Sequence, residues 1–140
     1  MSAAADTVVV LDFGSQYTQV IARRIREARV RSVVLPFDAK ASEVSKLSPK
    51  GIILSGGPSS VYDKEAPQGD AGLFDLKVPV LGLCYGMMWL AQRYGGKVGS
   101  APGREYGRAH VKVSGGRLFR GHAPLFRPLQ FCVHLRCFSM

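Results

Sequence analysis

The sequence lacks any long hydrophobic run. No apolar stretch among its 140 residues approaches the roughly 18 to 20 residues that a membrane-spanning helix needs. The opening residues, Met1 to Asp6, also lack the basic segment followed by an apolar segment that characterises a signal peptide. We therefore expect a cytoplasmic protein without a membrane partner.

Cysteine is scarce. The three cysteines, Cys84, Cys132 and Cys137, form neither an even-numbered disulfide framework nor a Cys-x-x-Cys pair. Such a set is typical of reduced thiols rather than of a secreted disulfide scaffold. We expect no metal site, and we expect at least one thiol to be reactive.

Acidic residues are missing from the last quarter of the chain, where no Asp or Glu follows Glu105. The formal net charge is +9, from 19 Lys+Arg and 10 Asp+Glu, and the acid-free segment 114–140 contributes four arginines. Arg23, Arg24 and Arg26 belong to an expected helix whose other face is apolar, so we interpret them as a solvated face rather than a phosphate-binding patch. Nucleic-acid binding through the basic tail has little except charge in its favour, and we expect no nucleic-acid partner.

Short apolar runs alternate with helical patterns, in a chain long enough for one domain. The apolar runs 8–11 and 52–54 are continuous, as strands buried on both faces of a parallel sheet are. The fold class is therefore α/β, a three-layer and mostly parallel sheet with helices on both faces. The expected strands are 7–12, 32–35, 51–54 and 80–83, and the expected helices are 17–28, 42–47 and 85–94.

Three loops should share one edge of this sheet. Ligands of parallel sheets gather beyond the carboxyl ends of the strands, which here places residues 13–16, 55–60 and 84–86 together. A further strand is expected over 106–113, whereas residues 121–140 show no convincing helical or strand pattern.

A cysteine directly follows the last of the four expected strands. In Gly82-Leu83-Cys84-Tyr85-Gly86 it lies between a strand and a helical pattern, with a glycine two residues to each side. This spacing is typical of a nucleophile elbow, a strained turn that projects its side chain away from the sheet. The N-terminus of the next helix would lower the pKa of the Cys84 thiol, and the Tyr85 N–H would face a developing oxyanion. A buried structural cysteine is the alternative interpretation, and the motif alone is a weak signal.

A second loop, Ser55 to Ser60, contains the adjacent glycines Gly56 and Gly57. Such a pair lets backbone N–H groups approach a ligand closely, as an oxyanion hole or an anion site requires. The loop lacks the Lys-Ser or Lys-Thr ending of a P-loop, so nucleotide binding by that route is disfavoured. An ordinary strand-to-helix turn is the simpler alternative.

Three segments together resemble one family in order and approximate spacing. They are 10–18 (VLDFGSQYT), 54–62 (LSGGPSSVY) and 82–87 (GLCYGM). The chain resembles the class I glutamine amidotransferases and, among them, the N-terminal amidotransferase domain of the GMP synthase family. The resemblance covers residues 7 to about 121.

The resemblance implies a glutaminase site that supplies ammonia for the amination of XMP to GMP in purine biosynthesis. It implies no cofactor for glutamine hydrolysis, and ATP with magnesium only in a synthetase (ATP-pyrophosphatase) domain or subunit that receives the ammonia. The implied residues are the nucleophile Cys84, the oxyanion-hole N–H groups of Gly57 and Tyr85, and, for binding L-glutamine, Gly56, Gly57, Pro58 and Met88.

The sequence departs from that family at two points. The family completes its triad with a His-Pro-Glu sequence, and none is present: His110, His122 and His134 are not followed by Pro-Glu. Met88 stands where the family has a glutamine that helps to bind the substrate. Without the triad base, activity should fall by several orders of magnitude.

We therefore expect a partial amidotransferase domain over 7–121, incomplete at its C-terminus, and a divergent tail over 122–140 for which no regular structure is predicted. An abrupt loss of resemblance and an acid-free tail favour a truncation or a shifted reading frame after about residue 121. On this interpretation the chain alone is inactive. The alternative is a non-catalytic α/β binding module, a remnant of the enzyme that associates with a synthetase partner.

Overall fold

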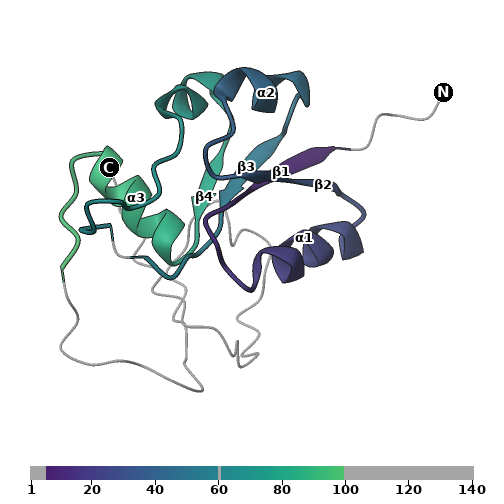
Figure 1. Ribbon diagram of the computed structural model, residues 1–140. Helices are drawn as coiled ribbons and strands as arrows, with labels where there is room; N and C mark the ends of the chain where they lie inside the picture. Colours follow the sequence, from purple (N-terminus) through teal and green to yellow (C-terminus); the bar gives the residue numbers. More distant parts are fainter. Residues whose placement is uncertain (1–5, 60, 100–140) are drawn as a thin grey trace, which may run out of the picture. The chain divides into compact units, whose positions relative to one another are not determined.

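Four parallel strands form the sheet at the centre of a computed structural model, which describes residues 6–59 and 61–99. The strands are β1 (Thr7–Asp12), β2 (Arg31–Pro36), β3 (Gly51–Leu54) and β4 (Val80–Gly82). Their order is β2-β1-β3-β4 (Figure 1), and every neighbouring pair is parallel. This confirms the parallel α/β sheet that the continuous apolar runs predicted.

Three α-helices and one 3-10 helix connect these strands. They are α1 (Thr18–Glu27), α2 (Ala41–Lys46), the 3-10 helix η1 (Ala71–Leu76) and α3 (Tyr85–Arg93). Each α-helix begins and ends within one residue of its predicted bounds, whereas η1 was not predicted. None of the helices in the described part of the chain is long and apolar enough to cross a membrane. The strand predicted over 106–113 lies outside the described residues.

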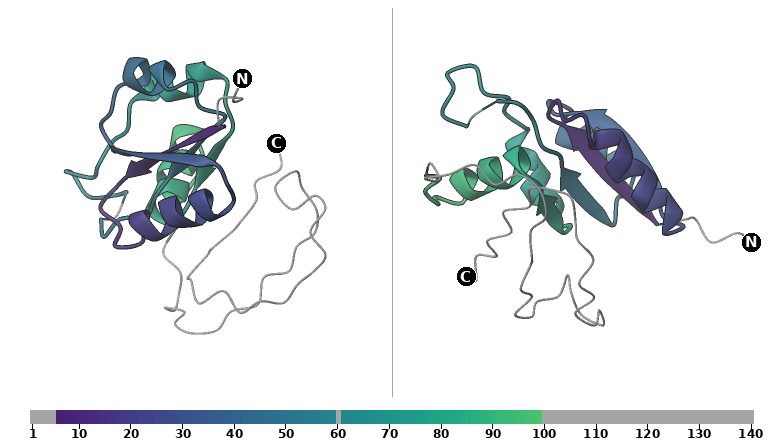
Figure 2. Two further views of the ribbon diagram at one scale, coloured as in Figure 1. Left: turned by 90° about the vertical axis from the view of Figure 1, so that its right-hand side faces the viewer. Right: turned by 90° about the horizontal axis from the view of Figure 1, so that it is seen from below.

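The helices cover both faces of the sheet, which makes the three layers. Figure 1 shows α1 on one side, with α2 and η1 on the other, and the two views in Figure 2 show the strands between them. The core cluster on the α2 side includes Val9 and Leu11 of β1 together with Val44 of α2 and Leu73 of η1. Successive side chains of a strand point to opposite faces, and Val10, between Val9 and Leu11, is also fully buried. Burial on both faces explains why β1 is apolar over these successive positions.

An aromatic cluster joins α3 to this core. The ring of Phe13, at the end of β1, lies 5.4 Å from the ring of Tyr85 and 5.8 Å from that of Trp89, measured between centroids. Tyr85 is fully buried, and Phe13 and Trp89 are almost so. The start of α3 is therefore held against the carboxyl end of β1. The loops that follow β1 and β4 thus lie at the same edge of the sheet, which we call the rim.

The carboxylate of Asp70 links α2 to η1. It accepts hydrogen bonds from the Gly72 N–H (2.9 Å) and, across 29 residues of sequence, from the Ala41 N–H at the start of α2 (3.1 Å). These two bonds, Gly72 first, lower the pKa of Asp70 below its ordinary value of 3.8. Asp70 is thus an N-cap for one helix and a tether for another.

Replacing Asp70 by asparagine should remove a pH-dependent part of the stability. Because the folded state lowers the pKa of Asp70, the ionised side chain stabilises the fold above pH 3.8, and this contribution is lost as the pH falls through the lower folded-state value. We expect Asp70→Asn to be less stable than the wild type near neutral pH and to approach it in acid. Urea unfolding followed by circular dichroism between about pH 2 and pH 7 measures the difference.

Asp75→Asn is the matched control, since Asp75 is an exposed residue of η1 that accepts no hydrogen bond from any described residue. Its stability difference from the wild type should change little with pH over this range. Equal pH profiles for the two variants would contradict the role of Asp70.

Candidate active site

Cys84 occupies a sharp turn between β4 and α3. Its backbone has φ 50° and ψ −114°, and a positive φ of this size is rarely adopted by non-glycine residues. Holding such a residue costs on the order of 1–3 kcal/mol, which the surrounding structure must offset. The Gly86 N–H donates to the Ser55 carbonyl (3.1 Å) and the Leu83 N–H to the Leu54 carbonyl (2.9 Å), so the end of β3 holds the turn in place. The structure thus has the strained strand-to-helix turn that defines a nucleophile elbow.

Both glycines of the Gly-x-Cys-x-Gly motif are required by close backbone packing. A Cβ on Gly82 would lie 2.7 Å from the Gly86 carbonyl oxygen and from the Met87 nitrogen. A Cβ on Gly86 would lie 2.5 Å from the carbonyl oxygen of Leu54. Real Cβ atoms do not come this close to backbone atoms, so any larger residue would separate α3 from β3 or β4. The motif therefore has glycine at these two positions because neither has room for a side chain.

The Cys84 side chain is exposed and lies at the N-cap of α3. The N-terminus of a helix favours an anion such as a thiolate. Gly56 is its neighbour across the rim: a Cβ on Gly56 would lie 3.1 Å from the Cys84 Cβ and 3.8 Å from its Sγ. The Cys84 side chain therefore lies beside the loop that contains Gly56 and Gly57, as the expected gathering of loops at one edge requires.

The side chain of Ser55 connects the loop that contains Gly56 and Gly57 to the loop that follows β1. Its side chain is fully buried; Oγ accepts a hydrogen bond from the Phe13 N–H (3.0 Å) and donates one to the Gly56 carbonyl (3.0 Å). A Cβ on Gly57 would overlap the Phe13 carbonyl oxygen. The two loops consequently form one rigid unit beside Cys84.

The N–H groups of Gly57 and Tyr85 are available to a ligand. Within residues 6–59 and 61–99, neither group donates a hydrogen bond. An oxyanion hole needs preorganised donors that the protein does not use itself. Their role as oxyanion donors stays a prediction, supported by this availability.

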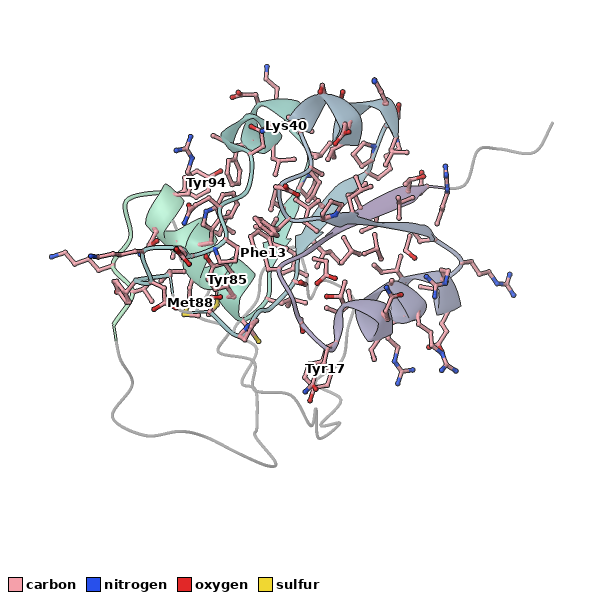
Figure 3. All side chains as sticks on the ribbon, in the orientation of Figure 1. Phe13, Tyr17, Lys40, Tyr85, Met88 and Tyr94 are labelled. Atoms are coloured by element: carbon pink, nitrogen blue, oxygen red, sulfur yellow. The ribbon has the colours of Figure 1, made fainter. Side chains whose placement is uncertain are left out.

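Two further predicted site residues, Pro58 and Met88, belong to the described part of the chain. Pro58 is exposed, and Met88 is half-buried against the core cluster (Figure 3). Their contact with substrate stays a prediction. His110, His122 and His134, and with them any triad partner of Cys84 that they would supply, lie outside the described residues.

Sequence reasoning missed how the Tyr85 side chain holds the loop between β3 and η1. Its hydroxyl donates to the Pro67 carbonyl (2.6 Å), and the Trp89 Nε1–H donates to Gln68 Oε1 (2.9 Å). Burial, and then the charge of Asp63, raise the pKa of Tyr85, so the phenol stays a donor at neutral pH. The only signal available was two aromatic residues four apart on the expected helix, which predicts a buried face but not a partner.

Comparison with known proteins identifies the class that this fold and rim define. A family profile described as "Glutamine amidotransferase class-I" matches residues 9–131, and the chain belongs to that family. It is 51% identical over 130 residues to "GMP synthase [glutamine-hydrolyzing]" of Caldanaerobacter subterraneus subsp. tengcongensis, covering 93% of this chain and 24% of that protein. The protein of the same name from Synechococcus sp. (strain CC9311) is 58% identical over 107 residues, with 76% and 20% covered. The chain thus spans about a quarter or less of the length of these relatives.

A solved structure shares the fold. It is the crystal structure of a candidate GMP synthase subunit from Thermoplasma acidophilum, 27% identical, with a TM-score of 0.71. The similarity covers 87% of this chain and 62% of that one. The arrangement of β1, β3 and the elbow is therefore that of an amidotransferase domain.

Ser55→Ala should destabilise the fold by about 1–3 kcal/mol, because it leaves the buried Phe13 N–H without an acceptor. Urea unfolding of the two proteins measures the difference. Ser45→Ala is the matched control: its Oγ donates to the Ser42 carbonyl on the exposed surface of α2, and its loss should change stability by less than about 0.5 kcal/mol. A cost for Ser55→Ala no larger than for the control would refute the proposed fastening of the loops.

Proposed function

We propose that this chain carries the nucleophile and the oxyanion donors of a glutaminase of the GMP synthase type. The observation that carries the proposal is the Cys84 elbow facing the Gly56-Gly57 loop, in a chain that belongs to the class-I amidotransferase family. The names of the relatives, which specify glutamine hydrolysis, support L-glutamine as the substrate.

The chemistry begins with the thiolate of Cys84. It attacks the side-chain amide carbon of glutamine, and the carbonyl oxygen becomes an oxyanion that accepts hydrogen bonds from the N–H groups of Gly57 and Tyr85. The C–N bond then breaks, and the amide nitrogen leaves as ammonia with the proton that the thiol released. Water hydrolyses the resulting thioester, so that glutamine and water become glutamate and ammonia and the thiol is restored.

A general base is needed to carry that proton, and residues 6–99 contain no histidine. The printed sequence also contains no His-Pro-Glu segment. We therefore propose that the base is contributed from outside the described residues and that the 140-residue chain alone turns over glutamine very slowly. Loss of a triad member typically lowers kcat by several orders of magnitude.

We propose that the ammonia passes to a synthetase domain or subunit, which would aminate XMP to GMP with ATP and magnesium. The relatives at about 50% identity are several times longer than this chain and are named as GMP synthases, which supports a further domain with that activity. The resulting assembly would act in the cytoplasm, in purine biosynthesis.

Cys84 should be alkylated by a diazoketone analogue of L-glutamine, because the analogue places its ketone where the amide carbonyl would lie and an electrophilic diazo carbon, which loses N2, in place of the amide nitrogen. We expect saturable labelling of one site by intact-mass spectrometry, competition by L-glutamine, and loss of the label in Cys84→Ser. Peptide mapping identifies the modified residue.

The double variant Cys132→Ser/Cys137→Ser is the control, and it should label as the wild type does. Labelling that falls on Cys132 or Cys137, or that L-glutamine does not slow, would rule out a glutamine site at Cys84.

A further inference from the structure

The Tyr85 side chain is held at its ring and at its hydroxyl. The ring lies 5.4 Å from that of Phe13, centroid to centroid, at an interplanar angle of 40° (Figure 3). The hydroxyl donates a hydrogen bond to the Pro67 carbonyl (2.6 Å), across 18 residues of sequence. Since the residue is fully buried, its ring cannot shift without breaking that bond or disturbing the core.

The segment that accepts this hydrogen bond is itself fixed to α3. Gln68 Oε1 accepts from the Trp89 Nε1–H (2.9 Å), so the residue after Pro67 is also bonded to the helix. A Cβ on Gly69 would lie 2.8 Å from Trp89 Cη2, which shows how closely the segment packs on that ring. The Pro67 carbonyl is therefore a fixed point of attachment for Tyr85.

The two proposed oxyanion donors belong to different segments of the chain. The Gly57 N–H belongs to the loop between β3 and η1, and the Tyr85 N–H belongs to the start of α3. The Tyr85 N–H shares a peptide group with the Cys84 carbonyl, which accepts from the Met88 N–H (3.1 Å) and so moves with the first turn of α3. The distance between the two donors thus depends on how α3 is held to that loop.

The first turn of α3 is held to this loop at two places. Near the start of the loop, the Ser55 carbonyl accepts from the Gly86 N–H (3.1 Å). Near its end, the Pro67 carbonyl accepts from the Tyr85 hydroxyl. Because the two bonds come from successive residues of α3, together they fix both the position and the tilt of its first turn relative to the loop.

Phe13 contacts both residues that carry the proposed donors. Its ring packs on the Tyr85 ring, and its carbonyl lies against Gly57, where a Cβ would overlap the carbonyl oxygen. Phe13 is itself almost fully buried. A shift of the Tyr85 ring would therefore also disturb the residue that supports Gly57.

We infer that the Tyr85 side chain is a positioning group, which fixes its own backbone N–H relative to that of Gly57. The inference rests on the proposed glutaminase function. The phenol itself does not touch the substrate, because its ring is buried and its hydroxyl is bonded to Pro67. It acts on the transition state alone, since an oxyanion hole is effective only when both donors are in place before charge develops.

Tyr85→Phe removes the hydroxyl and keeps the ring, and its effect is measured through the alkylation of Cys84. The ketone oxygen of the diazoketone glutamine analogue would accept from both donors, so we expect the maximal labelling rate to fall about tenfold. The half-saturating concentration should change by less than about twofold, because no contact with the bound analogue is lost. Iodoacetamide, whose loss of iodide forms no oxyanion, should label Cys84 at the wild-type rate.

Gln68→Ala is the matched control. Gln68 is exposed and joins the same loop to α3 through Trp89, one turn beyond Tyr85. This variant weakens the attachment of the loop but leaves the Tyr85 hydrogen bond in place. It should match the wild type in maximal labelling rate and in half-saturating concentration.

The possible results separate the two proposals. If iodoacetamide labels the wild type and the glutamine analogue does not label it saturably, the proposed glutaminase function fails. If the analogue labels the wild type saturably and Tyr85→Phe leaves the maximal rate unchanged, only the positioning role fails. An equal loss in Gln68→Ala, a loss confined to the half-saturating concentration, or a parallel loss with iodoacetamide would also overturn that role, because each would show that the hydroxyl only maintains the local structure.

Discussion

The contact between α3 and the end of β3 is the constraint on which the site depends. Gly86 lies directly against Leu54, and its N–H is bonded to the carbonyl of Ser55. This approach leaves room for no side chain at position 86, and it fixes the turn in which Cys84 adopts a positive φ. The strained conformation persists because the sheet on one side and the helix on the other determine it. The Cys84 thiol is thus exposed because the close packing of the α3 and β3 backbones fixes the turn that carries it.

The second half of the site depends on the same end of β3. Ser55 follows that strand and is bonded through its hydroxyl to the loop after β1, while Gly57 lies against the Phe13 carbonyl. The proposed nucleophile Cys84 and the proposed oxyanion donor Gly57 therefore belong to different loops, and both loops are held by the end of β3. An oxyanion hole stabilises a transition state only if its donors are in place before charge develops. The hydrogen bonds and close contacts around Ser55 provide such preorganisation without any substrate.

The positions of the strands and most helix bounds could be predicted from the sequence because burial repeats regularly there. β1 is apolar at successive positions since both of its faces are covered. The glycines around Cys84 have the spacing that an elbow requires, although this motif alone was a weak signal. The 3-10 helix η1 was missed because six residues give too short a pattern, and its start depends on Asp70 bonding to distant Ala41. The roles of Ser55 and the Tyr85 hydroxyl were missed for the same reason. A hydrogen bond between residues far apart leaves no local pattern.

The proposed roles of the described residues include a nucleophile and oxyanion donors but no general base. The proposed nucleophile Cys84 follows β4, and the proposed oxyanion donors are Gly57, in the loop after β3, and Tyr85, at the start of α3; these segments pack directly on one another. A base must reach the sulfur from the solvent side, since the sheet and α3 occupy the other sides of the elbow. The described residues thus fix the positions of the proposed nucleophile and oxyanion donors, and the proposed general base is the component that must come from elsewhere.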